Sequence, residues 1–390
     1  MNKRKHILFL CSWYPNKNAP TLGNFVQKHA ESAALYNQVS VIAIFSHTES
    51  SYKLERSTEN NVNSFIVYYP KVSFPIPGIK QLIQAYRTKK AFKLAFNAVL
   101  ESHGKPTFVH LNQVFPIGQF ALFLKRKYNL PFVATEHSTA YHMGSNRLPY
   151  FALRFSVNCM KQAAMILPVS NDLQHSLNKL GVNVPMRIIP NVVNEHIFGV
   201  LPSYHPEKTQ FTHISTAVDD HKNISGMLRS VKKLSEITTD FHFLIVSDGD
   251  TKPFIDLAYN QLRIAKELLS FEGTKTTQEV AEAINQSTAF VLFSNYENLP
   301  CVILEALTVG KPVISTAVNG VPECVNTSNG ILIEPGDEEQ LTQAMLSIIQ
   351  KEVEFDSKKI KLQALDTYSY RAVGKTFDAI YDEILEGHVS

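Results

Sequence analysis

NYENLPCVILEALTVGKP, at residues 295–312, contains a helix whose surroundings can be inferred from its side chains. Residues 289–294, AFVLFS, form a run typical of a buried strand, and a polar loop carrying Glu297 joins this strand to the helix. The helix is expected to begin near Pro300, which suits a first helical position, and to end at Gly310, which adopts a left-handed cap easily. Apolar side chains cover nearly all of its faces, so the helix is predicted to be buried.

Glu305 is the charged residue inside that apolar helix. A buried carboxylate without a partner would cost at least several kcal/mol, so Glu305 must accept a strong hydrogen bond. A donor within its own domain is one interpretation, because structural pairing is the commoner fate of buried charges. Glu297 favours another, because its loop leads into a helix N-terminus, where α/β sheets bind phosphate. Two carboxylates separated by about 7 Å along such a helix could hold hydroxyls on both sides of a diphosphate, as in a nucleotide-sugar.

The sequence around these carboxylates resembles the donor site of the retaining GT-B glycosyltransferases, within them family 4. The resemblance rests on Glu297-x7-Glu305, on GKPVI at residues 310–314 and on NGVPE at residues 319–323. These motifs lie in a block from Phe271 to Asn329 whose strand, loop, helix and turn signals follow the family's order. The resemblance extends over most of the chain. It implies an α/β fold with two doubly wound, parallel-sheet, Rossmann-like domains facing across a cleft.

The resemblance also implies roles for individual side chains. Glu305 would bind the ribose hydroxyls, and Glu297 would hold sugar hydroxyls near the anomeric carbon. His137, which follows a predicted strand, would hydrogen-bond a ring hydroxyl of the transferred sugar, although a lone histidine is more often structural. Lys222 would hold the diphosphate, and an exposed residue at the start of a helix is the alternative. The Arg that family members carry before this Lys is absent, and His221 is a candidate substitute.

The other residues expected to bind the donor belong to three loops. The start of the helix near Pro300 would contact the diphosphate, and a loop after Phe271 would contact the nucleobase. The first loop of the chain would contact the donor phosphates and the acceptor. These residues are Asn298, Leu299, Pro300, Cys301, Val302, Gly273, Thr274, Gly23 and Asn24. Family members often have two glycines in the first loop, so a simple turn glycine is the alternative for Gly23. No metal and no cofactor is expected, and Asp248-Gly249-Asp250 is interpreted as a turn.

Buried-strand runs alternate with amphipathic helices, which predicts doubly wound parallel sheets. An acceptor-binding domain is expected over residues 1–190, with the C-terminal helix 369–390 packing back on it, and a donor-binding domain over residues 191–368. The strands predicted for the first domain are residues 6–11, 39–45, 65–69, 108–111, 132–135, 166–169 and 187–189. The helices predicted along the chain include residues 78–100, 224–234, 277–285, 338–350 and 370–385.

Charge is distributed unevenly along the chain. Residues 1–200 hold 22 Lys and Arg against 8 Asp and Glu, a net charge of +14, whereas residues 201–390 hold 16 against 27, a net charge of −11. The basic half indicates an anionic partner, for which an anionic membrane surface or a lipid-linked acceptor is favoured and a solvated basic face is the alternative. Nucleic acid is not expected, because no basic-aromatic recognition motif is present.

The four cysteines show no paired spacing, and no apolar run approaches the roughly 18–20 residues that span a bilayer. A cytoplasmic protein is therefore expected, with peripheral contact at the inner face of the membrane as an option. The function favoured is transfer of a sugar from a nucleotide-sugar to a saccharide or lipid-linked acceptor, in envelope polysaccharide or glycoconjugate synthesis. Another GT-B enzyme, such as a nucleotide-sugar epimerase, and a non-catalytic nucleotide-sugar sensor or scaffold remain as alternatives.

Overall fold

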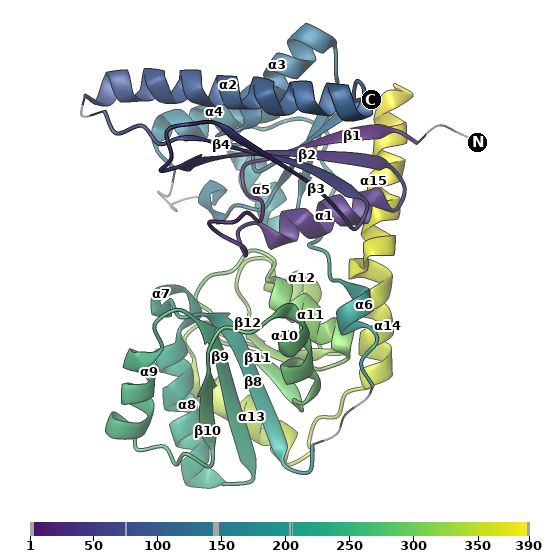
Figure 1. Cartoon of the computed structure of the whole chain (residues 1–390). Coiled ribbons are helices and arrows are strands. Elements are labelled where there is room, and N and C mark those ends of the chain that lie inside the picture. The colour runs from purple at the N-terminus through teal and green to yellow at the C-terminus, as the bar shows by residue number, and fades with distance from the viewer. Residues whose placement is uncertain (1–3, 75, 143–147, 203, 205, 388–390) are drawn as a thin grey trace. The chain divides into compact units, whose positions relative to one another are not determined.

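A computed structural model describes residues 4–74, 76–142, 148–202, 204 and 206–387, and the chain divides into two compact units (Figure 1). Unit 1 consists of residues 1–169, 173–190 and 370–390, and unit 2 of residues 170–172 and 191–369. The expected domains differ from these units only in the assignment of residues 170–172 and 369.

Unit 1 is built on a seven-stranded sheet with the order β3-β4-β2-β1-β5-β6-β7. All neighbouring strands are parallel except β3 and β4, which are antiparallel. The chain runs outward from β1 in one direction and returns to form β5 on the other side of β1, so the strand order reverses between these two strands. The strands are β1 (His6–Cys11), β2 (Gln38–His47), β3 (Lys53–Glu59), β4 (Val62–Pro70), β5 (Phe108–Asn112), β6 (Phe132–Glu136) and β7 (Met165–Pro168).

Helices cover both faces of this sheet, with α2 on one face and α1 on the other (Figure 1). They are α1 (Asn24–Ala34), α2 (Pro77–His103), α3 (Gly118–Tyr128), α4 (Tyr150–Met160), α5 (Asn171–Lys179) and the C-terminal α15 (Tyr370–Leu385). The helix α15 packs on α1, where the Ser32 hydroxyl donates to the Tyr370 carbonyl at 2.8 Å and a side chain at Gly374 would overlap the Ser32 carbonyl. His110 on β5 lies 2.6 Å from the Tyr381 hydroxyl, so the C-terminal helix is joined to the sheet as well.

Unit 2 has a six-stranded parallel sheet with the order β10-β9-β8-β11-β12-β13, which reverses between β8 and β11. Its strands are β8 (Thr209–Thr216), β9 (Phe241–Asp248), β10 (Leu269–Glu272), β11 (Ala289–Leu292), β12 (Val313–Thr316) and β13 (Gly330–Ile333). Its helices are α6 (Glu195–Phe198), α7 (Asp219–Lys222), α8 (Ile224–Ile237), α9 (Lys252–Asp256), α10 (Thr277–Asn285), α11 (Cys301–Val309), α12 (Val321–Cys324), α13 (Glu338–Ile349) and α14 (Ser357–Tyr368). Phe211, Phe241 and Phe243 are among the large side chains that fill its core.

The doubly wound sheets predicted from the sequence are confirmed, and three details differ. Residues 187–189 are not a strand. Met186 forms an isolated bridge to Ile166, and the amides of Arg187 and Ile189 donate to carbonyls of β7. The edge strand β3 was not predicted. Pro300 is the residue before the helix, with an extended ψ of 118°, so α11 begins at Cys301. Within the described part of the chain, no helix is both long enough and apolar enough to cross a membrane.

Candidate functional site

In unit 2, the loops after β8 and β11 meet at the carboxyl edge of the sheet. Open α/β sheets bind ligands at this edge, at the point where the strand order reverses. Lys222 follows β8 at the end of α7, and Glu297 lies in the loop between β11 and α11. The Lys222 ammonium is 2.5 Å from a Glu297 carboxylate oxygen, so two residues predicted separately form one ion pair.

The Glu297 carboxylate is buried and has a second donor. The hydroxyl of Ser294, a fully buried residue after β11, donates to the same carboxylate oxygen at 2.8 Å. The backbone amide of Glu297 donates to the Asn319 side-chain carbonyl at 3.4 Å. These contacts hold both the side chain and the backbone of Glu297 in one position at the strand edge.

The α7 turn that carries Lys222 is joined to the same loop through Asn295. The Asn295 amide donates to the His221 carbonyl at 2.8 Å, and its side chain donates to the Asp220 carbonyl at 3.2 Å. His221, considered above as a substitute for the missing Arg, therefore has a backbone role in fixing this turn. The Lys222–Glu297 pair and these two contacts of Asn295 join the two loops.

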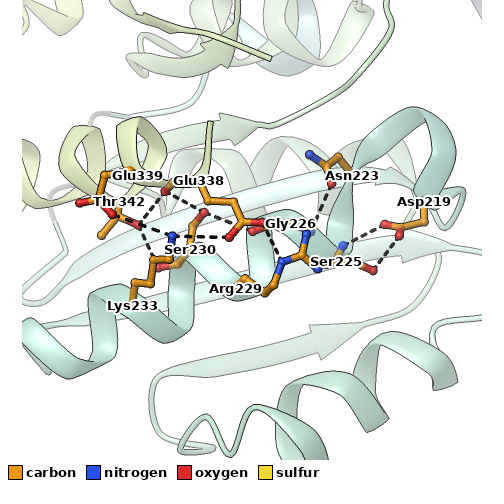
Figure 2. Close-up of polar contacts among 10 residues, drawn as sticks. All are labelled: Asp219, Asn223, Ser225, Gly226, Arg229, Ser230, Lys233, Glu338, Glu339 and Thr342. Atoms are coloured by element: carbon orange, nitrogen blue, oxygen red, sulfur yellow. Dashed lines mark hydrogen bonds and ion pairs between the residues drawn. The ribbon is translucent and has the colours of Figure 1, made fainter. Parts of the chain in front are cut away.

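Side chains at the start of α8 hold α7 in its turn (Figure 2). The Asp219 carboxylate accepts from the Ser225 amide at 2.8 Å and from its hydroxyl at 2.7 Å. Asn223 adopts a left-handed conformation with φ of 47°, and its side chain accepts from the Gly226 amide at 3.2 Å. A Cβ on Gly226 would lie 2.5 Å from the Asn223 side-chain oxygen, so this cap requires a glycine there.

The helix α8 is in turn joined to the start of α13 by charged and hydroxyl side chains (Figure 2). Arg229 donates to Glu338 at 2.7 Å, and the Ser230 hydroxyl donates to the Glu338 carbonyl at 3.1 Å. Thr342 extends this contact to the Ser230 carbonyl at 3.3 Å. These contacts attach the helix that orients Lys222 to the rest of unit 2.

The helix α11 presents its N-terminus to the same edge and buries Glu305 along its length. Glu305 is 9% exposed, as the apolar surroundings predicted. Gly310 ends the helix with φ of 95°, and a Cβ there would lie 2.7 Å from the Ser357 carbonyl. Asn298, Leu299 and Pro300 are buried, whereas Cys301 and Val302 are half-buried at the helix start. A helix N-terminus attracts anions, because its N–H groups and dipole point outward.

The residues predicted to meet the nucleobase lie at the end of β10. Gly273 and Thr274 are exposed, and the Thr274 hydroxyl donates to Asp248 at 3.0 Å. This contact gives Asp248 a role in the turn at the end of β9. Among the described residues, no group of three or more His, Cys, Asp or Glu side chains has the arrangement of a metal site.

In unit 1, His137 follows β6 at the carboxyl edge and is 8% exposed. Its ring packs against α1, with centroid distances of 4.6 Å to Phe25 and 5.1 Å to His29. His29 is completely buried and lies 3.0 Å from the Pro190 carbonyl. Burial lowers the pKa of His29 to about 4, so this neighbour of His137 is neutral at physiological pH.

Glu136 positions the backbone around His137. Its fully buried carboxylate accepts from the amides of His137 and Ser138, both at 3.0 Å, and of Val114 at 3.1 Å. Burial raises the pKa of Glu136 to about 7, and the hydrogen bonds from the three backbone amides oppose that rise. Glu136 therefore connects the loop after β5 to the loop after β6.

The first loop of the chain meets a conformational requirement at Gly23. This residue has φ of 66°, and a Cβ there would lie 2.6 Å from the Trp13 carbonyl carbon, so a larger residue would clash with backbone. Asn24 is the first residue of α1 and is exposed. The backbone conformation and packing at position 23 thus require glycine whether or not a ligand binds.

The structure brings Lys222 and Glu297 into contact and puts Glu305 on the helix that follows, while His137 and Gly23 belong to unit 1. Three neighbours were not singled out from the sequence: Ser294, Asn319 and His29. Asn319 lies in a motif that carried the resemblance. In the sequence, Ser294 resembles an ordinary residue at the end of a strand, and His29 an ordinary residue on a helix face.

Comparison with known proteins gives a family for both halves of the chain. Residues 31–196 match the model described as Glycosyltransferase Family 4, and residues 208–351 match Glycosyl transferases group 1. An uncharacterized glycosyltransferase of Methanocaldococcus jannaschii is 26% identical over 299 residues, which cover 75% of this chain and 78% of that protein. The amylovoran biosynthesis glycosyltransferase AmsK of Erwinia amylovora is 25% identical over 207 residues, or 50% of this chain and about half (49%) of its own length.

Among solved structures, HepE of Anabaena in complex with UDP superposes with a TM-score of 0.71 at 13% identity. The match covers 97% of this chain and 100% of HepE, and at this identity it supports the fold alone. Both doubly wound sheets of this chain are part of that match. Taken with the two family models, these findings show that the chain belongs to the family 4, group 1 glycosyltransferases of GT-B fold.

Proposed function

We propose that this glycosyltransferase moves a sugar from a nucleotide-sugar to a saccharide or lipid-linked acceptor, with retention at the anomeric carbon and without a metal ion. The Lys222–Glu297 pair at the edge of the unit 2 sheet carries the proposal. A bound donor offers a partner to each member of the pair. Its diphosphate would take Lys222 as a counter-ion, and its sugar hydroxyls would donate to Glu297.

Charge stabilisation would come from groups already on the loops around this pair. The N-terminus of α11 contributes about 0.3–2 kcal/mol toward one negative charge. Lys222 would supply the larger part, because a cation held by fixed contacts needs no reorganisation as charge develops. Glu305, a buried carboxylate on α11, would accept hydrogen bonds from the ribose hydroxyls.

In the transfer step, an acceptor hydroxyl oxygen forms a bond to the anomeric carbon from the face that the diphosphate leaves. The bond between the anomeric carbon and the phosphate oxygen breaks, and its electron pair stays on that oxygen. The departing diphosphate accepts the proton of the attacking hydroxyl. His137 would orient the transferred sugar through a hydroxyl, and Glu297 would bind its hydroxyls rather than attack the anomeric carbon.

The polysaccharide relative supports a role in envelope polysaccharide or glycoconjugate synthesis, because AmsK is named for amylovoran biosynthesis. The net charge of +14 on residues 1–200 supports an anionic acceptor or surface. We therefore propose that the enzyme works in the cytoplasm, at the inner face of the membrane.

A panel of UDP-, GDP- and ADP-sugars tests the donor. One class should raise the melting temperature, since a ligand at 100 times its Kd stabilises a protein by about 2.7 kcal/mol. The same donor should be hydrolysed slowly without an acceptor, with or without EDTA, and NMR of the freshly released sugar should show the donor's anomeric configuration. Hydrolysis that stops with EDTA would refute metal independence, and inversion would refute retention. Tight binding without turnover over any acceptor would favour the sensor instead.

A further inference from the structure

An apolar pocket of about 450 Å³ lies in unit 1 where the strand order of its sheet reverses. It is formed by residues at the end of β1, among them Cys11, by the loop after β5, and by side chains of α2 and α4. Phe115, Phe120, Phe151 and Phe155 supply much of its apolar wall. Ligand pockets commonly have about 300–1,000 Å³, an apolar lining and a few polar groups, and they favour this position in α/β sheets.

Two adjoining hollows continue this pocket between α2, α3 and α4. One of them shares Ala85, Gln119 and Phe120 with the first pocket, and the other shares Gln119 and Phe155 with it. Their outer residues include four cations, Lys89, Lys93, Arg126 and Lys127. Among the described residues that line the three hollows there is no carboxylate, so the positive charge is not compensated within this lining. We call the three hollows together the apolar groove.

Large apolar side chains are also exposed on the helices that form the groove. On α2, Leu82 and Tyr86 are 73% and 68% exposed, and Phe151 at the start of α4 is 68% exposed. Phe151 also lines the first pocket, so this exposed surface is continuous with the groove. Exposed apolar side chains beside a pocket are typical of surfaces that bind apolar ligands.

We propose that the apolar groove binds the hydrocarbon chain of a lipid-linked acceptor, and that the basic side chains bind an anionic group on the same lipid. This inference rests on the proposed function, because it specifies the acceptor. The inner end of the groove is at the carboxyl edge of the sheet, the edge that also carries His137. The chain occupies the phenylalanine-lined part, and phosphate is attracted by Lys89, Lys93, Arg126 and Lys127. A free saccharide would leave this apolar wall unused.

Alkyl phosphates of eight to twelve carbons, each below its critical micelle concentration, test the groove by calorimetry on the whole chain. Burial of one CH2 contributes about 0.8 kcal/mol, so affinity should rise about fourfold for each added carbon. Inorganic phosphate should bind much more weakly, and alkanols of equal length should lose the contribution of the cations. Affinity that does not change with chain length would overturn the proposal.

Variants on α2 locate the bound chain. Ala85 lines two of the hollows, so Ala85→Trp should fill the groove and lower the affinity for decyl phosphate at least tenfold. Asn97→Trp, at an exposed position of α2 outside the groove lining, is the matched control and should leave affinity unchanged. Equal affinity of the Ala85→Trp and Asn97→Trp proteins would contradict a chain bound in the groove.

Charge variants separate the groove from a general attraction to anionic surfaces. Lys89→Glu with Lys93→Glu should weaken decyl phosphate binding at least tenfold while changing decanol binding little. Lys80→Glu, at an exposed position of α2 outside the three hollows, is the control, with half the change in charge. If Lys80→Glu alone weakens alkyl phosphate binding as much as the double variant, binding is a property of the whole basic surface and the proposal fails.

The donor assays keep the two proposals apart. Alkyl phosphate binding without hydrolysis of any nucleotide-sugar would leave the groove intact and refute the transferase mechanism. Donor hydrolysis that is unchanged in the Ala85→Trp protein, together with chain-length-independent binding, would leave the transferase and refute the lipid acceptor.

Discussion

The two sheets reverse their strand order in the same manner, between β1 and β5 in unit 1 and between β8 and β11 in unit 2, yet different side chains occupy the two edges. In unit 2 the edge holds an ion pair, Lys222 with Glu297. In unit 1 the edge holds a pocket walled by phenylalanines, and His137 follows β6, the strand beside β5. A paired charge can exchange its partner for a charged ligand, whereas an apolar wall favours an uncharged chain. One architecture thus provides two kinds of binding site.

The two edges also differ in how their side chains are positioned. In unit 1, the buried carboxylate of Glu136 accepts three backbone amides from the loops around it. In unit 2, the equivalent role belongs to half-buried capping side chains, Asp219 and Asn223, at the junction of α7 and α8. Replacing Glu136 should therefore change the free energy of unfolding by an amount that depends on pH. Replacing Asp219 or Asn223 should have a smaller, local effect.

Glu297→Ala should give the largest effect and remove catalysis from the unit 2 edge. We expect kcat to fall by about 10³-fold or more, because a group that acts on the transition state is lost. Nucleotide affinity should change by less than about threefold, since Glu297 is proposed to hold the sugar. Product formation at saturating donor and calorimetry with the free nucleotide measure the two quantities. A loss of nucleotide affinity equal to that in Glu305→Ala would contradict the division of roles.

Glu136→Gln should change the pH dependence of unit 1 stability. The pKa of Glu136 is raised from 4.5 to about 7, so between these values the native state keeps a proton that the unfolded chain has lost. Glu136 therefore makes its full contribution to the free energy of unfolding below about pH 4.5. As the pH rises to about 7, that contribution falls by up to about 3 kcal/mol. Urea unfolding followed by the fluorescence of Trp13, the single tryptophan of the chain and a unit 1 residue, measures it. A difference between wild type and variant that stays constant from pH 5 to pH 7.5 would refute this titration.

Glu305→Ala should weaken nucleotide binding by about 10–100-fold, since hydrogen bonds to a charged group contribute about 1.5–3 kcal/mol. At saturating donor, kcat should remain within a few-fold of wild type, which is the reverse of the Glu297→Ala pattern. Calorimetry with the nucleotide gives the affinity, and Glu305→Gln, which keeps the side-chain volume, controls for loss of packing in α11. Unchanged affinity in a folded Glu305→Ala protein would remove the ribose-binding role.

Sequence reasoning predicted most strands and helices because their apolar periodicity is strong, and it missed elements where that periodicity is absent. The edge strand β3 reads KLERSTE and is exposed or half-exposed throughout, so no apolar alternation marks it. Two isoleucines at residues 188–189 suggest a strand, but this segment makes only an isolated bridge at Met186 and two amide hydrogen bonds to β7, from Arg187 and Ile189. Burial of α11 and its left-handed cap at Gly310 were predictable, because both follow from local composition.

The candidate site was predictable as separate residues and not as contacts. Lys222 and Glu297 are 75 positions apart, and they meet only because β11 forms beside β8. The apolar groove was not predicted for the same reason, since Phe120 and Phe155 appear in sequence as ordinary core residues of separate helices. His29 had no signal at all, because its contact with His137 depends on how α1 packs against the sheet.

Substitution of Asn223 should give the smallest effect. It tests how far the Lys222–Glu297 pair depends on the cap at the start of α8. Asn223→Ala loses a cap of about 1 kcal/mol and keeps a Cβ at φ of 47° without the local side-chain hydrogen bond that helps Asn to adopt this conformation. Asn223→Gly removes the same side chain but tolerates that φ, so it should cost only a few tenths of a kcal/mol. Urea unfolding of both variants measures the difference, and donor hydrolysis reports whether Lys222 keeps its place. If the Ala and Gly variants are equally stable and equally active, the left-handed turn does not determine the position of Lys222, and the contacts of Asn295 with α7 must be sufficient.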